Sequence, residues 1–471
     1  MNRRPWHVTG LLSLVAATLT VASCEDIVYR DRALFDDPVE GATGFLGYAD
    51  AAQGRTVCGQ CHVSYQRHWE GTAHAGAWTT LAASVGEDVS CRACHTTNAL
   101  GNTIEGAVGG YFAQPDSRYH DVQCESCHGP GLDHVRTPTR DTWPLASLAV
   151  GTDLSSGCGE CHTGDHQPFV EQWASSRHAN VRASPAGNPS CSSCHRGQDV
   201  LRSWGVRSEY LEKNATEHLP IGCGVCHDPH DATNPKQLRM PIDVASEEEN
   251  LCMQCHHKRG TPDPTTFRGP HSPEGPVLLG FGGWWPPNLE LQPGQLVATH
   301  GSEANPRLCA GCHVNQWEKR DGLTGQLIFR ATGHTFEAIP CADAEGIPTG
   351  SRECDLAQRT FRTCTQAGCH GTEAVARTLI TVVRDRLHTL ADALQAMEAL
   401  VPAGEYSDTD TRYTTAEGAR FNRELAQFRG SEIHNPWLIE ALLRGSIRQL
   451  QLDYGLAPPA GINLEQELGV H

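Results

Sequence analysis

The chain has 471 residues and a formal net charge of −18, because 55 Asp and Glu outnumber 37 Lys and Arg. Nucleic acids bind through basic surfaces, so this balance disfavours nucleic acid as a partner. Only 39% of the residues are hydrophobic and 6% aromatic, whereas the chain contains 21 Cys and 25 His. These proportions exclude an ordinary apolar core throughout a chain of this length, and they indicate that something other than side chains fills much of the interior.

The N-terminal residues have the layout of a secretory signal. Arg3 and Arg4 precede an uncharged apolar run, residues 8–22, that is too short for a membrane-spanning helix. The run ends in LTVASC, and small residues directly before Cys24 resemble a bacterial lipobox. We expect residues 1–23 to be a lipoprotein-type signal peptide and Cys24 to carry a lipid anchor, with plain secretion as the alternative. Export would place the protein in the periplasm or at the outer membrane.

The pattern Cys-x-x-Cys-His occurs eight times. The motifs are Cys58, Cys61 and His62; Cys91, Cys94 and His95; Cys124, Cys127 and His128; Cys158, Cys161 and His162; Cys191, Cys194 and His195; Cys223, Cys226 and His227; Cys252, Cys255 and His256; and Cys309, Cys312 and His313. Two thiols at this spacing can add to the vinyl groups on one porphyrin edge, while the next imidazole binds iron. Zinc ribbons, disulfide frameworks and dithiol redox motifs do not require a His after every second Cys. The motifs therefore predict eight covalent haem c groups.

A ninth, wider motif is CTQAGCH, in which four residues separate Cys364 from Cys369 and His370 follows. A longer loop can still bring both sulfurs to one porphyrin edge if it bulges outward. We therefore predict nine haem c sites, numbered 1 to 9 in chain order, and a disulfide between Cys341 and Cys354 in an oxidising compartment. The alternatives are a disulfide between Cys364 and Cys369, or one that joins either of them to Cys341 or Cys354, such as Cys354 with Cys369.

Sites 1 to 7 recur about every 33 residues, and a longer repeat of three motifs lies within this series. CGQCH followed by WEGTAHA is matched by CGECH followed by WASSRHA, which suggests a duplicated three-haem unit. We expect an N-terminal linker (24–57), two three-haem modules (58–157 and 158–250), a two-haem region (251–340) and a ninth-haem region with C-terminal helices (341–471). Residues 262–293 are rich in Pro and Gly and predict a loop.

The repeat also predicts the second iron ligands. Equivalent positions in the two modules are occupied by His74 and His178, by His120 and His218, and by His134 and His230. For the later sites we expect His271, His300, His334 and His434. Two imidazoles leave no vacancy for a substrate, which suits electron transfer. Because Met ligation raises the reduction potential and only Met240 and Met397 are plausible thioether ligands, the series is expected to have low potentials.

Two helices are predicted near the C-terminus. Apolar residues recur at helical spacing from Leu379 to Met397 and predict a helix within 373–400 that ends near Pro402. A second helix is expected to begin within 430–443, with Asn435 as its N-cap and Pro436 in its first turn, where His434 could lie over a haem. The predicted fold is mainly α with much irregular loop, built around a chain of packed haems and ending in a helical tail.

Three elements resemble the superfamily that joins the tetrahaem cytochromes c of ammonia oxidisers, hydroxylamine oxidoreductase and pentahaem nitrite reductase. They are CESCHGPG (124–131), a Trp-x4-His element after a motif and the His-Asn-Pro helix start at 434–436, and the likeness is best over 58–260. It implies closely paired haems that pass electrons in series. The chain lacks the Cys-x-x-Cys-Lys typical of the nitrite reductases, and no Tyr is identified as the counterpart of the cross-linked Tyr of hydroxylamine oxidoreductase.

These observations favour an electron relay over a catalyst, and no catalytic residue is assigned. Expected partners are other cytochromes or a quinol-oxidising complex, with the membrane reached through the lipid anchor. The second hypothesis is an oxidoreductase in which one haem lacks a distal His and acts on a small nitrogen or sulfur compound, such as nitrite or hydroxylamine. A third is a scaffold that assembles into a homo-oligomer or a haem-lined filament.

Overall fold

The computed structural model describes residues 37–39, 44–84, 88–102, 104, 108–144, 157–206, 217–265, 267–407 and 412–469. Residues 38–471 form one compact unit. The expected signal peptide and Cys24 lie outside the described residues. Within the described ranges, no helix is both long and apolar enough to cross a bilayer.

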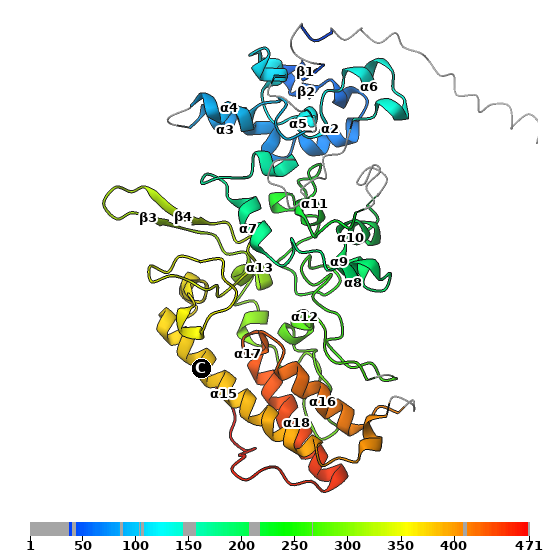
Figure 1. Ribbon diagram of the computed structural model, residues 1–471, viewed down its shortest axis with the longest axis vertical. Coiled ribbons are helices and arrows are strands. Elements are labelled where there is room, and N and C mark those ends of the chain that lie inside the picture. The colour runs from blue at the N-terminus through cyan, green and yellow to red at the C-terminus, as the bar shows by residue number, and fades with distance from the viewer. Residues whose placement is uncertain are drawn as a thin grey trace, which may run out of the picture. The chain divides into compact units, whose positions relative to one another are not determined.

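The fold is mainly helical with long irregular segments (Figure 1). Most helices before residue 370 are short, and many of them lie at a haem motif. They are α2 (Val63–Trp69), α3 (Ala77–Ala82), α4 (Arg92–His95), α5 (Cys124–His128), α6 (Leu132–Arg136), α7 (Phe169–Ser175), α8 (Ala183–Gly187), α9 (Ser192–His195), α10 (Gly197–Ser203), α11 (Cys223–Cys226), α12 (Glu274–Leu278), α13 (Leu308–His313) and α14 (Arg362–Thr365).

The two segments predicted as three-haem modules share the same local contacts, in agreement with the sequence repeat. In the first, the indole N–H of Trp69 donates to Val122 O over 3.0 Å, and Val122 N donates to His74 O over 3.1 Å. In the second, Trp173 donates to Ile221 O over 2.9 Å, and Ile221 N donates to His178 O over 3.1 Å. Each Trp therefore anchors the segment before the third motif of its module beside the same His.

Side-chain cores in the modules are small, in agreement with the composition. One gathers Phe45, Ala99, Tyr111 and Tyr119, and another gathers Val170, Trp173 and Ala179. Phe45 falls within the segment predicted as a linker, yet it is fully buried and its carbonyl accepts a 2.9 Å hydrogen bond from the Tyr119 hydroxyl. The last part of that segment is therefore packed into the first module.

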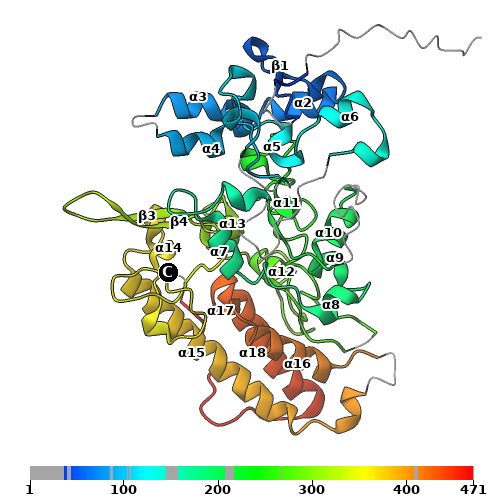
Figure 2. The same cartoon turned by 45° about the horizontal axis from the view of Figure 1, so that its top comes forward.

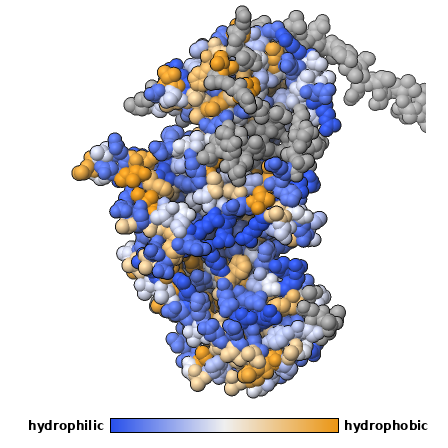
Figure 3. Space-filling model, viewed as in Figure 1, coloured by the Kyte–Doolittle hydropathy of each residue, from blue (hydrophilic) through white to orange (hydrophobic). Residues whose placement is uncertain are grey.

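In the part of the chain that the structure describes, four short strands form two antiparallel pairs. β1 (Tyr48–Asp50) pairs with β2 (Arg55–Thr56), and β3 (Trp317–Arg320) pairs with β4 (Leu327–Ala331). The β3–β4 hairpin projects from the neighbouring elements, and Leu323 in its turn is 99% exposed. Hydrophobic surface is visible at its end on the face shown in Figure 3. The sequence analysis did not predict this hairpin.

The C-terminal helices hold the one large apolar core among the described residues. α15 (Glu373–Glu398), α16 (Thr415–Ala426) and α18 (Pro436–Tyr454) lie side by side in Figures 1 and 2. Their contacts bury Leu390, Phe421 and Leu443 completely. The predicted helix within 373–400 is thus confirmed as α15, whereas α16 was not predicted.

Asn435 positions the start of α18, as predicted. Its side-chain oxygen accepts from Leu438 N over 3.2 Å, its amide donates to Leu296 O over 2.8 Å, and the residue is fully buried. Pro436 occupies the first turn, where a missing N–H costs nothing. The short helix α17 (Ser431–His434) ends directly before this cap, so the cap also fixes the position of His434.

Leu390→Ala should destabilise the C-terminal helices by about 2–5 kcal/mol, because it leaves a cavity at a fully buried position. Chemical denaturation followed by far-ultraviolet circular dichroism measures the change. Leu400→Ala is the matched control, since Leu400 is 66% exposed and should cost at most about 0.5 kcal/mol. Equal losses in the two variants would contradict this account of the core.

Candidate haem-binding sites

Each motif forms a tight turn that brings its thiols and imidazole together. In sites 1, 4, 5, 6 and 7 the N–H of the motif His donates to the carbonyl of the first Cys over 2.8–3.2 Å. In sites 2, 3 and 8 the His ends α4, α5 and α13. This single helical turn places both sulfurs beside the imidazole, as covalent haem attachment requires.

Site 9 keeps the same closing hydrogen bond despite its wider spacing. His370 N donates to Cys364 O over 3.1 Å, so the two additional residues bulge away from the turn. Gly368 lies in this bulge with φ of 76°, and a Cβ at that position would meet no atom within 4 Å. The bulge is thus built from a residue suited to the left-handed region.

Cys341 and Cys354 form a disulfide, as predicted, and this excludes the alternative pairings that use either of them. Cys364, Cys369 and the sixteen cysteines of the other motifs are free thiols. Site 9 therefore has the same set of unpaired groups as sites 1 to 8.

Replacing both Cys364 and Cys369 with Ala should lower the number of covalent haems by one, from nine to eight. Intact mass of the mature protein made with a working maturation system counts the haems. Replacing both Cys341 and Cys354 with Ala is the control, because it removes two nearby cysteines and should leave nine. A mass that already corresponds to eight haems in the unmodified protein would contradict a ninth site.

Imidazole pairs provide a direct test of whether the residues fit haem iron. Metal–nitrogen bonds of about 2.0–2.1 Å, with each ring centre about 1.1 Å behind its nitrogen, place two ligand rings roughly 6.3 Å apart. Eight motif His residues have a second imidazole with its centre 6.0–6.4 Å away. The pairs are His62–His134, His162–His74, His128–His230, His195–His271, His227–His334, His256–His178, His313–His434 and His370–His300. The spacing fits one iron between the rings of each pair.

Several pairs join different modules, which the sequence repeat could not show. His74 of the first module faces His162 of the second, and His230 of the second module faces His128 of the first. In the same way His178 faces His256, and His334 faces His227. Each module thus supplies an imidazole to a neighbouring segment.

Burial prepares the distal imidazoles for a metal. It lowers the pKa of His74, His178, His334 and His434 to about 4, and nearby imidazoles add to the effect. These rings are therefore neutral near pH 7, and only a neutral imidazole binds iron. At the ordinary pKa of about 6.5 part of the population would be charged at mildly acidic pH.

Backbone carbonyls orient many of these rings through Nδ1. His227 pairs with Lys236 O at 2.8 Å, His313 with Phe336 O at 2.9 Å and His300 with Ile433 O at 2.6 Å. A hydrogen on Nδ1 leaves the lone pair of Nε2 for iron and fixes the ring plane. Lys236 and Phe336 both have positive φ, at 60° and 55°, so two of these carbonyls are presented by residues in the left-handed region.

Glu274 gives site 7 a different second partner. Its Oε2 lies 3.3 Å from His256 Nδ1, where the other ligands named above have a neutral carbonyl. Burial alone would lower the pKa of His256, but the hydrogen bond and charge of Glu274 outweigh it and raise the pKa. A carboxylate partner increases the basicity of a ligand imidazole and favours the more positive oxidation state of the metal. The sequence analysis did not identify this residue.

Two predicted ligands are not brought to any motif imidazole. The ring of His120 stacks on Trp78 at 3.8 Å, and the ring of His218 lies beside Gly187. Among the described residues, no second imidazole lies at the ligand spacing from His95 of site 2, whose Nδ1 pairs with Ala77 O at 2.7 Å. The repeat gives His120 and His218 equivalent positions along the chain, but it does not determine the direction in which each imidazole ring points. Met397 is buried in the helical core, away from this role.

The proximity of thiols gives the order of the sites in space. Thiols of different sites lie near enough to shift one another's pKa, most strongly in the pairs Cys58 and Cys124, Cys94 and Cys161, Cys158 and Cys223, Cys194 and Cys255, and Cys252 and Cys309. A weaker electrostatic effect on the pKa relates Cys127 to Cys158, Cys226 to Cys255, and Cys312 to Cys364. The sites therefore follow the order 1–3–4–6–7–8–9, with site 2 attached at site 4 and site 5 attached at site 7.

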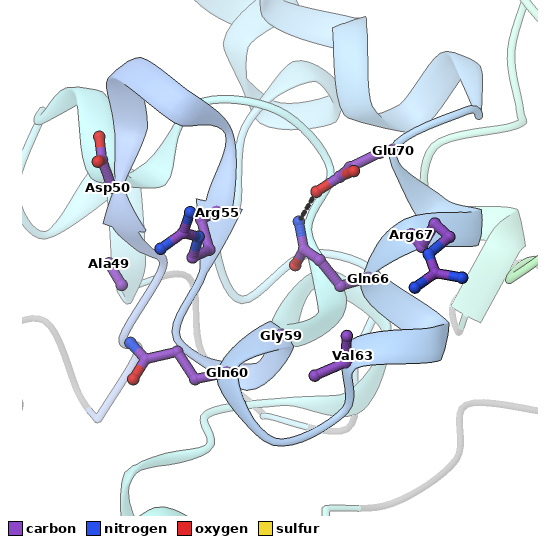
Figure 4. Close-up of a pocket in the computed structure, with 9 residues that line it drawn as sticks. All are labelled: Ala49, Asp50, Arg55, Gly59, Gln60, Val63, Gln66, Arg67 and Glu70. Carbon is purple, nitrogen blue, oxygen red and sulfur yellow. Dashed lines mark hydrogen bonds between the residues drawn. The ribbon is translucent and has the colours of Figure 1, made fainter. Parts of the chain in front are cut away.

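Site 1 lies at the surface beside an open pocket of about 660 Å³ (Figure 4). Gly59 and Gln60, which separate the two thiols of site 1, form part of its wall. Gln66 stabilises that wall, because its amide donates to Glu70 Oε1 over 2.8 Å and its oxygen accepts from Thr56 Oγ1 over 2.6 Å. A Cβ at position 59 would lie 2.1 Å from the Gln66 oxygen, so a side chain there would displace the Gln66 amide from its hydrogen bonds.

Family models match two parts of the chain. Residues 57–129 match cytochrome c554 and c-prime, and residues 219–261 match a doubled CXXCH motif. Together they cover sites 1 to 3 and sites 6 and 7, and they support haem c binding through these motifs.

Curated relatives match similar parts. Multiheme cytochrome MtrA of Shewanella baltica is 26% identical over 36% of this chain and 53% of its own length. Cytochrome c-554 of Nitrosomonas europaea is 30% identical over 24% of this chain and 59% of its own length. C-type polyheme cytochrome OmcB of Geobacter sulfurreducens is 24% identical over 52% of this chain and 27% of its own length. The chain thus spans between about a quarter and three fifths of the relatives it matches.

Among solved structures, the Outer Cell Wall Cytochrome OcwA has a similar fold. The TM-score is 0.54 at 16% identity, over 87% of this chain and all of that one. The likeness supports the mainly helical, loop-rich fold.

Proposed function

The chain is a multihaem c-type cytochrome related to the cytochrome c554 and c-prime family, and from this premise we propose that it relays electrons between redox partner proteins outside the cytoplasm. Haem c supplies reversible one-electron chemistry when bound. The observation that carries the proposal is the series of neighbouring sites from site 1 to site 9, in which the thiols of each site lie near those of the next.

The two ends of this series, sites 1 and 9, are the sites with a solvent-exposed thiol. Of the eighteen motif cysteines, only Cys61 of site 1 and Cys369 of site 9 are exposed. Val63 and Tyr65 beside site 1 are each 55% exposed. Partners such as other cytochromes or a quinol-oxidising complex would therefore exchange electrons at sites 1 and 9. Lipidation of Cys24 would hold the protein at the periplasmic side of a membrane or at the outer membrane.

The paired imidazoles suit this role. An iron held between two His residues of this chain would have no vacancy for a substrate, and its ligands would not need to change between oxidation states. Scarcity of Met ligands keeps the potentials low, since a thioether in place of one imidazole would raise them. The chain's own contribution is to fix the planes of the rings through backbone carbonyls.

Removing site 6 should slow electron arrival at site 9 at least about tenfold, whereas removing site 5 should not, because only site 6 lies in the main series. A photosensitiser on Ser64→Cys, an exposed position beside site 1, injects the electron. His300→Met raises the potential of site 9 and makes it the acceptor whose reduction is timed. The site 6 variant carries Cys223→Ala and Cys226→Ala.

The matched control carries Cys191→Ala and Cys194→Ala, which removes site 5 by the same two changes. Intact mass verifies that each variant lacks one haem only. Equal slowing in both variants would contradict the proposed order, and unchanged arrival in both would contradict the relay itself.

A second candidate function is favoured by site 2 alone. His95 has no second imidazole at ligand spacing among the described residues, so an iron held by His95 would have a coordination position for a small ligand. In this case the protein would act on a nitrogen or sulfur compound of the nitrite or hydroxylamine type, and site 4 would exchange the electrons through the Cys94–Cys161 contact.

We expect the ferric protein to show one high-spin component that shifts on adding nitrite or hydroxylamine, measured by electron paramagnetic resonance and absorption spectra. Replacing Cys91 and Cys94 with Ala should abolish that component, whereas the site 5 variant should keep it. A wholly low-spin spectrum without a ligand-dependent shift would exclude this second function and leave the relay as the one that stands.

A further inference from the structure

Phe336 has a backbone conformation that is rare for a bulky residue. Its φ is 55°, and its N–H donates to Gly333 O over 3.1 Å in a tight turn after β4. A large side chain with positive φ costs free energy and persists only where the surrounding structure enforces it. Such strain is concentrated at functional positions, so the contacts made by Phe336 are informative.

The carbonyl and the ring of Phe336 contact imidazoles of three successive sites. The carbonyl accepts from His313 Nδ1 of site 8 over 2.9 Å. The ring packs edge-on against His178 of site 7, with centres 4.6 Å apart and planes at 80°. It also packs against His334 of site 6, with centres 5.7 Å apart and planes at 59°. One residue thus contacts ligand rings of sites 6, 7 and 8.

Aromatic rings occupy comparable positions elsewhere in the series. Phe169 packs edge-on against His334 of site 6 at 4.9 Å and against His162 of site 4 at 5.7 Å. In the first module Tyr65 packs edge-on against His230 of site 3 at 5.0 Å and against His62 of site 1 at 6.3 Å. Tyr65 and Phe169 are repeat equivalents, because each lies four residues before the Trp of its module.

Phe336 differs from these two in combining a ring contact with a backbone contact. The ring restricts the rotation of the His178 and His334 planes, because edge-to-face packing has a preferred geometry. The carbonyl fixes the plane and tautomer of His313. The left-handed conformation is what allows ring and carbonyl to act on different imidazoles.

We propose that Phe336 is a positioning residue that sets the ligand orientation, and with it the reduction behaviour, of sites 6, 7 and 8 together. The inference rests on the proposed relay function and identifies the segment of the series where three consecutive transfer steps share one support. Ring and carbonyl act separately, so their effects can be separated by mutation.

Phe336→Gly removes the ring while glycine keeps the left-handed conformation and the carbonyl. Phe336→Leu removes the aromatic ring but keeps an apolar side chain. In both variants of the full holoprotein we expect the low-spin signals of sites 6 and 7 to change in electron paramagnetic resonance and that of site 8 to remain. In a redox titration, the ferric-to-ferrous ratio of sites 6 and 7 at a fixed potential should shift at least tenfold, equivalent to about 59 mV.

Signals are assigned with His178→Met and His334→Met, which alter sites 7 and 6 individually. Phe169→Leu should change sites 4 and 6 and leave site 7, so it shares one affected site with Phe336→Leu. Phe421→Leu is the structural control, because Phe421 is fully buried in the C-terminal core and has no ring contact with a ligand imidazole among the described residues. It should leave every signal unchanged.

Unchanged signals of sites 6 and 7 in both Phe336 variants would overturn the proposal, as would equal changes in Phe421→Leu. Intact mass of the unmodified protein distinguishes this failure from failure of the relay. A protein that lacks haem at sites 6 to 8 would contradict the proposed function, whereas a fully loaded protein with insensitive signals contradicts only the role of Phe336.

Discussion

The separation of two imidazole rings by the width of one bound iron is the constraint on which the rest of the structure depends. Eight pairs meet it within a few tenths of an ångström. Short helices, left-handed residues and backbone carbonyls between the motifs can all be understood as means to hold these rings in place. The modules have only small side-chain clusters as cores. The imidazole pairs, and the groups that fit between them, occupy the rest of the interior.

Much of the site could be predicted from the sequence, because its chemistry is local. Paired thiols followed by His identify one attachment turn each, and the Cys341–Cys354 disulfide followed from the compartment and from the cysteines left over. Eight of the ten expected distal His residues lie at ligand spacing. The start of α18 was predictable as well, since Asn435 and Pro436 act within a single turn.

The remainder depends on contacts between distant segments. His120 and His218 recur in the repeat, yet stacking on Trp78 and the place beside Gly187 direct their rings elsewhere. Other features join residues whose separation in the sequence follows no repeat. These features are the pairing of ligands across modules, the carboxylate contact of Glu274 and the three contacts of Phe336. Helix α16 was missed because its buried face includes Glu417 and Asn422, which weaken the apolar pattern.

The exchange of ligands between modules has a consequence for how such a chain can grow. His74 pairs with a site that lies later in the chain, site 4, and His178 likewise pairs with site 7. His230 pairs with a site that lies earlier in the chain, site 3, and His334 likewise pairs with site 6. Each of the two modules therefore exchanges ligands with the following segment in the same way. Repetition of such a unit would extend the series of ligand pairs with the same junction each time, and at the end of the series the helical bundle supplies His434 as the partner of His313.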